Sequence, residues 1–270
     1  MPPTLRVLVR GSSDIGSAVA HQLFQAGYAV VIHEIPKPTH TRRKMAFTDA
    51  IFDGSSILEN LEAHLIEKRS LLRGLLVAHE IIPITTINLQ MVFQSIHPHV
   101  LVDARMRKHF QPENQRRWAK LTIGLGPNFI AGENVHIAIE TARGATLGHV
   151  ITQGATKPLE GEPQNIAGHT RDRYVYAPVA GEFRSTRQIG ELVAKGDDIA
   201  HIGEMILRAP ISGTLRGLTH NNIPVEIRTK VIEIDPRLEN IQIFGISERP
   251  ARIAKGVLQA IKEWENNYVS

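Results

Sequence analysis

"LRVLVRGSSDIGSAVAHQLFQAGYAVVIHE", from Leu5 to Glu34, is the stretch that decides the predicted fold. Leu5–Arg10 is short, apolar and rich in valine, which is typical of a buried strand. The small-residue turn "GSSDIG" (Gly11–Gly16) leads into Ser17–Ala26, whose apolar spacing predicts a helix. Tyr28–Glu34 then predicts a second strand. The sequence therefore predicts a strand–helix–strand unit, the start of a doubly wound parallel sheet.

Composition narrows the class of protein. The 270 residues leave room for two modest domains, and the absence of cysteine excludes disulfides, cysteine-ligated metal and a persulfide carrier. No apolar run approaches the roughly 18 residues of a membrane span, and no signal peptide is evident, so we expect a soluble cytoplasmic protein with no membrane partner. The net charge is +4, and the basic stretches are either solvated surface or a basin for a phosphorylated ligand; no nucleic-acid signature accompanies them.

The first turn is the leading candidate for a ligand site. A glycine-rich turn between a strand and a helix exposes backbone N–H groups to a phosphate, and an acid ending the next strand can bind a ribose hydroxyl. The dinucleotide fingerprint is incomplete, because Ser13 replaces its middle glycine. The alternative is a tight turn in which Ser13 or Asp14 caps the helix. The predicted cofactor-binding residues in this part of the chain are Gly11, Ser12, Ser13, Asp14, Gly16, Glu34, Arg42 and Arg43.

A second glycine-rich loop, "IGLGPNFIAG" (Ile123–Gly132), follows another predicted strand. In an open α/β sheet, such loops meet at the carboxyl ends of the strands. The glycines either cradle a ligand or serve backbone positions with positive φ. The predicted cofactor-binding residues here are Gly124, Gly126 and Gly132, with Asp103 at the end of the strand "VLVD". No metal-binding or hydrolase motif accompanies them, so we predict no metal and assign no catalytic residue.

"YVYAPVAGEF" (Tyr174–Phe183) and "ILRAPISGTL" (Ile206–Leu215) repeat one phrase 32 residues apart. Neither half can bury its apolar face alone, so the two are expected to form one small β sandwich. Such a sandwich resembles the biotinyl- and lipoyl-carrier domains, the barrel-sandwich hybrids, which carry a modified lysine between their halves. No lysine occurs between Lys195 and Lys230, so no biotin or lipoyl attachment is predicted.

The predicted fold class is α/β: a Rossmann-like parallel-sheet domain plus a C-terminal barrel-sandwich hybrid without the acceptor lysine. Within the first domain, Leu58–Lys68 is predicted to be helical or mixed. The predicted boundaries are 1–155 for the α/β domain, 156–173 for a linker, 174–236 for the β domain, and 237–270 for a strand and helix that pack back on the α/β domain.

Phrases along nearly the whole chain resemble the accessory proteins of the selenium-dependent molybdenum hydroxylase system, which are related to the maturation factors of xanthine dehydrogenase. The phrases are "VRGSSDIGSAVAHQL", "EIPKPTHTRRKMAF", "VLVDAR", "IGLGPNFIAG", "IETARG", "LGHVITQG", "APVAG", "GELVAKGD", "LRGL", "EIDPR" and "ISERPARIAKGVLQAI". The chain departs from the family pattern at "GPNF", where Gly-Pro-Gly-Phe is expected, and in its C-terminal phrase.

This resemblance implies an accessory or maturation factor rather than a classical enzyme. The factor would bind molybdenum cofactor (molybdopterin) or a nucleotide at the glycine-rich strand ends and dock on a molybdenum hydroxylase client. Two alternatives stay open: an NAD(P)-dependent oxidoreductase, suggested by Gly11, Gly16 and Glu34, and a non-catalytic protein-interaction module. Whether the chain forms a homo-oligomer is also left open.

Overall fold

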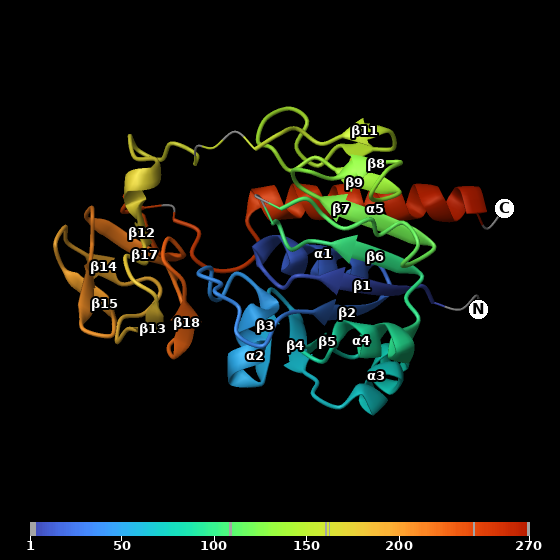
Figure 1. Cartoon of the computed structure of the whole chain (residues 1–270), viewed down its shortest axis with the longest axis horizontal. Coiled ribbons are helices and arrows are strands. Elements are labelled where there is room, and N and C mark those ends of the chain that lie inside the picture. The colour runs from blue at the N-terminus through green and yellow to red at the C-terminus, as the bar shows by residue number, and fades with distance from the viewer. Residues whose placement is uncertain (1–3, 108–109, 160, 162, 240, 269–270) are drawn as a thin grey trace.

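The computed structural model describes residues 4–107, 110–159, 161, 163–239 and 241–268. Figure 1 shows an α/β unit, where both chain ends lie, beside a smaller unit made of strands. Residues 156–173, which include the short helix η3 (Arg171–Arg173), lead from the first unit to the second. After the β unit the chain returns to the α/β unit as helix α5 (Glu248–Tyr268).

A nine-stranded sheet forms the centre of the α/β unit, in the order β10-β9-β7-β6-β1-β2-β5-β4-β3. Its strands are β1 (Arg6–Arg10), β2 (Ala29–His33), β3 (Ser55–Leu58), β4 (Leu61–Leu65), β5 (Ile82–Thr85), β6 (Val100–Asp103), β7 (Leu121–Leu125), β9 (Ile137–Ile139) and β10 (Val150–Ile151). The strands from β9 to β4 run parallel, and β1 and β6 are neighbours at the point where the strand order reverses. The carboxyl ends of these two strands therefore meet, as they do at ligand sites of open α/β sheets.

The large sheet is mixed, which corrects the predicted parallel sheet. Strand β3 pairs antiparallel with β4, and β10 pairs antiparallel with β9. Only Glu59 and Asn60 separate β3 from β4, and two residues can join antiparallel strands but not parallel ones. The same hairpin occupies part of Leu58–Lys68, so the helical or mixed prediction for that segment is also wrong.

Helices cover both faces of this sheet (Figure 1). Val7 and Val9 of β1 face the layer of α1 (Asp14–Gln25) and α5, whereas Leu8 faces α3 (Leu72–Ala78) and α4 (Leu89–Ile96). An unbroken apolar run was therefore the right signal for a strand buried on both faces. Three short helical turns complete the unit: η1 (Phe47–Asp49), α2 (Ala50–Asp53) and η2 (Arg69–Leu71). Of the helices in the described residues, none is long and apolar enough to cross a membrane.

The β unit contains two four-stranded antiparallel sheets, β12-β19-β17-β14 and β16-β15-β13-β18. The strands are β12 (Tyr174–Tyr176), β13 (Gly181–Arg184), β14 (Leu192–Val193), β15 (Asp198–Ile202), β16 (Met205–Arg208), β17 (Gly213–Leu218), β18 (Ile223–Val225) and β19 (Lys230–Asp235). Each sheet takes two strands from each repeat, so the halves interlock around one apolar core. A separate two-stranded sheet, β8 (Ile130–Ala131) with β11 (Gly154–Ala155), belongs to the α/β unit.

The repeated glycine has a packing reason. A Cβ atom at Gly181 would lie 2.7 Å from the Ile202 side chain, and one at Gly213 would lie 2.3 Å from the Asp235 carbonyl oxygen. Each of the two glycines therefore allows its strand to pack closely against a neighbouring strand, β15 for Gly181 and β19 for Gly213. No biotinyl-type barrel-sandwich is shown here, so the predicted carrier-like fold class is corrected to two antiparallel sheets attached to a mixed α/β unit.

The two units are joined by direct contacts. The Leu218 N–H donates to the Thr41 carbonyl oxygen at 2.8 Å, and His220 Nε2 lies 2.7 Å from Asp49 Oδ1. The His220 ring also stacks on Phe52, with ring centroids 4.0 Å apart. The segment between β2 and η1 therefore lies against the β unit and brings its own side chains to the junction.

Candidate functional site

The first glycine-rich turn packs tightly against the residues that follow strand β6. Gly11 has φ of +103°, and a Cβ atom there would lie 3.0 Å from the backbone of Ala104 and Arg105. A Cβ atom on Gly16 would lie 2.0 Å from the Gly11 carbonyl oxygen. These glycines allow α1 and the end of β6 to approach the turn closely. The chain itself occupies the space beside Gly11.

Glu34 is engaged by the same turn. Its Oε2 atom accepts hydrogen bonds from the Ser12 N–H at 2.8 Å and the Ser12 hydroxyl at 3.0 Å, and its Oε1 accepts from the Ile35 N–H. The carboxylate thus closes the turn instead of pointing at a free ribose position. Ser13 stands at the N-cap of α1 without a side-chain capping bond, and Asp14 begins the helix.

The glycines of the second loop serve packing and turns. A Cβ atom on Gly124 would lie 2.2 Å from the Phe129 ring. Gly126 has φ of +97° and its carbonyl oxygen accepts from the Thr156 hydroxyl at 2.7 Å. Gly132 has φ of +88° with open space around it, as a turn requires.

Asp103 anchors the loop that follows β6. Its Oδ1 accepts from Arg105 Nε at 2.9 Å, and its Oδ2 accepts from Gln115 Nε2 at 2.6 Å and from Arg10 at 3.4 Å. Burial alone would raise the pKa of Asp103, but the bonds and charge of Arg105, with Arg10, lower it. Both carboxylate oxygens are occupied by protein groups, which suits a structural anchor.

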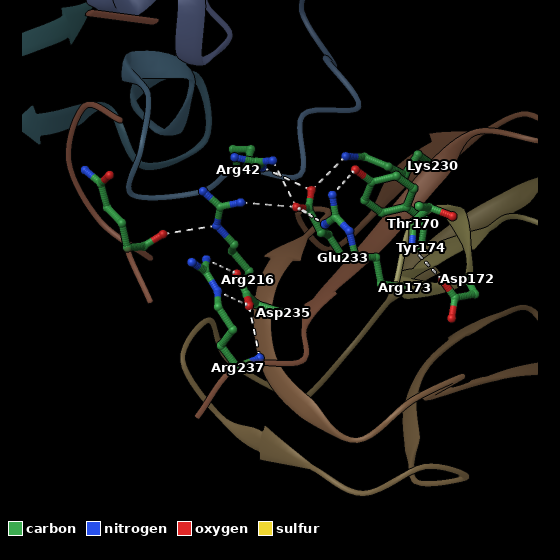
Figure 2. Close-up of polar contacts among 11 residues, drawn as sticks. Arg42, Thr170, Asp172, Arg173, Tyr174, Arg216, Lys230, Glu233, Asp235 and Arg237 are labelled. Carbon is green, nitrogen blue, oxygen red and sulfur yellow. Dashed lines mark hydrogen bonds and ion pairs between the residues drawn. The ribbon is translucent and has the colours of Figure 1, made fainter. Parts of the chain in front are cut away.

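A basic cluster lies where the two units meet, and we define it as Arg42, Arg173, Arg216 and Lys230 around the carboxylate of Glu233 (Figure 2). Arg42 donates through two nitrogens, Nε to Oε2 at 3.1 Å and Nη2 to Oε1 at 2.9 Å. Arg42 comes from the α/β unit, whereas the other members come from η3 and strands β17 and β19. The cluster therefore joins parts of the chain about 190 residues apart in sequence.

The other three cations reach the same carboxylate. Arg173 Nη1 donates to Oε1 at 2.8 Å, Lys230 Nζ donates to Oε2 at 2.9 Å, and Arg216 Nη1 lies 3.4 Å from Oε1. The Glu233 side chain is fully buried and that of Arg173 is 3% exposed. Arg173 Nε is buried and has no hydrogen-bond partner in the described chain. One carboxylate is thus shared by four cations.

The pKa values of these side chains reflect the excess of positive charge around Glu233. Burial alone would raise the pKa of Glu233, but the charges of Lys230 and Arg42 hold it below its usual range. Burial lowers the pKa of Arg216, and the charge of Arg42 lowers it further. Burial also lowers the pKa of Lys230, with Glu233 opposing and Arg42 reinforcing the change. Cations in this cluster repel one another.

Two further arginines stand beside the cluster. Arg249, in the first turn of α5, donates to the Thr141 carbonyl oxygen at 3.0 Å. Arg143 is exposed, and within the described chain its guanidinium forms no hydrogen bond or ion pair. Although the residue as a whole is exposed, partial loss of water around its side chain is the largest influence lowering the pKa of Arg143, and the charges of Arg42 and Arg173 also lower it. Both arginines therefore face the positive field of the cluster.

Asp14 links α1 to this region. Burial is the largest influence on the pKa values of Arg42, Lys230 and Arg249, and the charge of Asp14 opposes it in all three. Of the residues predicted from sequence, the structure thus brings Asp14 near Arg42. Ser12 and Ser13 lie in the turn directly before Asp14. Arg43 is half-buried and forms no hydrogen bond or ion pair with any residue that the structure describes.

Glu34, Asp103, Gly124 and Gly132 form no hydrogen bond or ion pair with a cluster member in the described chain, and four of the five cluster members were not predicted. Arg173, Arg216, Lys230 and Glu233 belong to the duplicated strands, where alternation indicated only a β sandwich. A glutamate at a buried strand position, "VIEID", was the one available signal. Lys230 lies three residues before Glu233 on the same strand, whereas the fold brings Arg42, Arg173 and Arg216 to the carboxylate from other parts of the chain.

Two open surface depressions lie elsewhere. One is lined by Lys44, Ile57, Glu59, Phe244 and Gly245, and the other by Arg6, Phe93, Gln94, His97, Pro98, His99, Trp118 and Lys120. Neither is lined by a member of the basic cluster. The candidate site therefore rests on charge and hydrogen-bond geometry rather than on a preformed cavity. The described residues contain no group of three or more histidines and acids placed to hold a metal.

No protein-family model matches this chain. The chain is 38% identical over 255 residues to the uncharacterized protein YqeB of Escherichia coli K12, an alignment that covers 94% of this chain and 47% of that protein. The chain thus spans about half the length of the curated relative it matches.

Several solved structures show remote similarity. They are a succinylglutamate desuccinylase from a Silicibacter species (15% identity, 86% and 84% of the two chains, TM-score 0.26), an aspartoacylase family protein from Mesorhizobium loti (7%, 87% and 86%, 0.28), and a succinylglutamate desuccinylase/aspartoacylase from Rhodobacter sphaeroides (15%, 87% and 87%, 0.27). At these TM-scores the similarity does not indicate what this chain does.

The comparisons correct the family resemblance inferred from sequence. The relative is uncharacterized, and the structural neighbours are desuccinylase and aspartoacylase proteins rather than molybdenum hydroxylase accessory proteins. The predicted family, the maturation role and its alternatives, and molybdopterin or a nucleotide as cofactor are therefore withdrawn. The closed turn at Gly11 and Glu34 gives a physical reason, because it offers a dinucleotide neither space nor a free acid.

Proposed function

We propose that this protein binds a small polyanion of the phosphate class at the basic cluster. One observation carries the proposal: four cations surround the single buried carboxylate of Glu233. Burying charge without an opposite charge is costly, so a cluster with excess positive charge favours a bound anion. A polyanion would relieve the repulsion among these cations.

The cluster is accessible to a ligand. The side chains of Arg42 and Lys230 keep 18% and 31% of their surface exposed, and exposed Arg143 lies in the same field. An arginine fork matches the oxygens of a phosphate group, and several forks favour a ligand with more than one anionic group.

Two helix N-termini near the cluster already carry acids of their own. Helix α1 begins at Asp14, whose carboxylate accepts from the Ile15 N–H at 3.0 Å, and α5 begins at Glu248. These acids offset the positive ends of the helices, so the proposal rests on the side-chain cations. Of the residues predicted from sequence, Arg42 belongs to the basic cluster and Asp14 acts on it through its charge, whereas Ser13 and Arg43 stay predictions from the sequence. A cytoplasmic location and a homo-oligomeric state stay proposals from the sequence.

Calorimetric titration tests the binding proposal. Sodium trimetaphosphate and pyrophosphate are titrated into the full chain, Arg42→Gln and Arg184→Gln. Arg184 is a matched control because it is exposed and pairs only with Glu182 among the described residues. Losing one charge-assisted bond of about 1.5–3 kcal/mol should weaken binding about tenfold or more in Arg42→Gln and leave Arg184→Gln unchanged. Absence of binding by both anions at low salt, or equal binding by both variants, would overturn the proposal.

A further inference from the structure

His40 is a titratable group at the junction with no role in the basic cluster as defined. It lies two residues before Arg42, on the segment whose Thr41 carbonyl oxygen accepts from Leu218 of the β unit. Contacts with the β unit therefore fix the backbone around His40.

The ring of His40 has a defined hydrogen-bond pattern. Its Nε2 atom lies 2.7 Å from the Arg42 carbonyl oxygen. A carbonyl oxygen only accepts, so Nε2 carries the proton and the neutral ring keeps its lone pair on Nδ1. Within the described chain, no group hydrogen-bonds to Nδ1. His40 thus has one nitrogen held by the backbone and one available to a ligand.

The charged groups facing His40 come from three elements. Asp14 lies on α1, Asp49 on η1, and Arg42 on the same segment as His40. Asp49 is already bonded to His220 and to the Lys44 N–H. Burial lowers the pKa of His40, with Asp14 and Asp49 opposing it, which favours the neutral ring in the free protein. Arg42, whose carbonyl oxygen holds the ring at 2.7 Å, is also the cluster member whose charge acts on His40, so His40 borders the basic cluster at Arg42.

From this geometry we infer that His40 Nδ1 is part of the anion site and takes up a proton when a phosphate-class polyanion binds. This inference rests on the proposed function. An anion beside the ring adds negative charge, which favours the imidazolium form and gives Nδ1 a proton to donate. Binding and protonation are then linked, so the anion binds more tightly as the pH falls through the range in which histidine titrates.

Calorimetry in two buffers of different ionisation enthalpy measures this proton directly. Trimetaphosphate is the probe, because it stays fully ionised near neutral pH and exchanges no proton itself. We expect uptake of a fraction of a proton near pH 6.5, fading above about pH 8. His40→Gln keeps a donor for the Arg42 carbonyl oxygen, and it should still bind the anion, more weakly than the wild type and without that proton uptake. His201→Gln, at an exposed position of β15, should keep the wild-type uptake.

The outcomes separate the two proposals. Binding heat that does not depend on the buffer, or wild-type uptake in His40→Gln, overturns the role of His40 while leaving the anion site standing. No binding heat in any buffer overturns both. Thermal melts of each variant confirm that the chain is folded before the titration.

Discussion

Glu233 connects the two units at the scale of single atoms. Its carboxylate receives Arg42 from the α/β unit and Arg173, Arg216 and Lys230 from the β unit and its approach. A buried ion pair offsets its own desolvation only while the partners remain together. The sequence could not identify these partners, because only Arg42 belongs to a recognisable basic stretch.

Replacing Glu233 with glutamine should leave four cations without their carboxylate. Breaking a buried pair costs about 3–5 kcal/mol, and we expect a loss of this size in the free energy of unfolding, measured by urea denaturation. Trimetaphosphate should restore part of the lost stability. Glu182→Gln is the control, since Glu182 is exposed and its loss should change stability by less than about 0.5 kcal/mol. A Glu233→Gln protein as stable as the control contradicts this account.

Gly16 tests the close packing of the first turn. An alanine Cβ there would lie 2.0 Å from the Gly11 carbonyl oxygen, so overpacking should cost about 1–3 kcal/mol. Gly74 in α3 is the matched position, because it is exposed and a Cβ would meet nothing within 4 Å. Gly74→Ala should therefore stabilise the protein by about 0.4–1 kcal/mol. Thermal melts of both variants measure the difference, and equal stabilities would count against the packing argument.

At the scale of elements, the sequence predicted the strand–helix–strand start and the duplication. It missed the hairpin of β3 and β4, because "SSILENLEAHL" has apolar residues that fit a helix as well as two short strands. It also missed the exchange of strands between the repeats, since identical spacing within each half does not indicate which half a strand pairs with.

The interlocked repeats make their two equivalent glycines unequal in a testable way. At Gly213 the nearest obstacle to a Cβ is the backbone oxygen of Asp235, whereas at Gly181 it is a methyl group of Ile202. A side chain yields more easily than backbone. Gly213→Ala should therefore lose about 1–3 kcal/mol and Gly181→Ala clearly less, as measured by urea denaturation. A larger loss of stability in Gly181→Ala than in Gly213→Ala would contradict the observed packing of these glycines against β15 and β19.

The contact between Asp49 of η1 and His220, in the loop after β17, should contribute to the stability of the protein in a pH-dependent way. Burial alone would raise the pKa of Asp49, but hydrogen bonds from His220 and the Lys44 N–H lower it. A carboxyl group with a depressed folded-state pKa stabilises the protein above the pKa of the unfolded chain, near 3.9, and the contribution is lost as the pH falls through the folded-state pKa. The stability advantage of the wild type over Asp49→Asn should thus be full above about pH 5 and shrink below it. A difference independent of pH in thermal melts would exclude this link as a contributor.

At the scale of the whole molecule, part of the basic composition gathers at the junction of the two units. The basic stretches of the sequence left a choice between solvated surface and a basin for a phosphorylated ligand, and the structure places four cations around Glu233 where the β unit meets the α/β unit. Length and periodicity predicted two units but not their junction. Residues such as Arg42 and Glu233 meet only after both units have folded and packed together.

A crystal structure of the full chain soaked in sodium arsenate shows whether an anion binds at the basic cluster, because arsenate is a phosphate-class anion that scatters anomalously. We expect an anomalous peak within hydrogen-bond distance of Arg42 and at least one further cation of the basic cluster, and no such peak in Arg42→Gln. Arsenate bound only at other surfaces, or an empty cluster at a concentration that saturates the protein in solution, would contradict it.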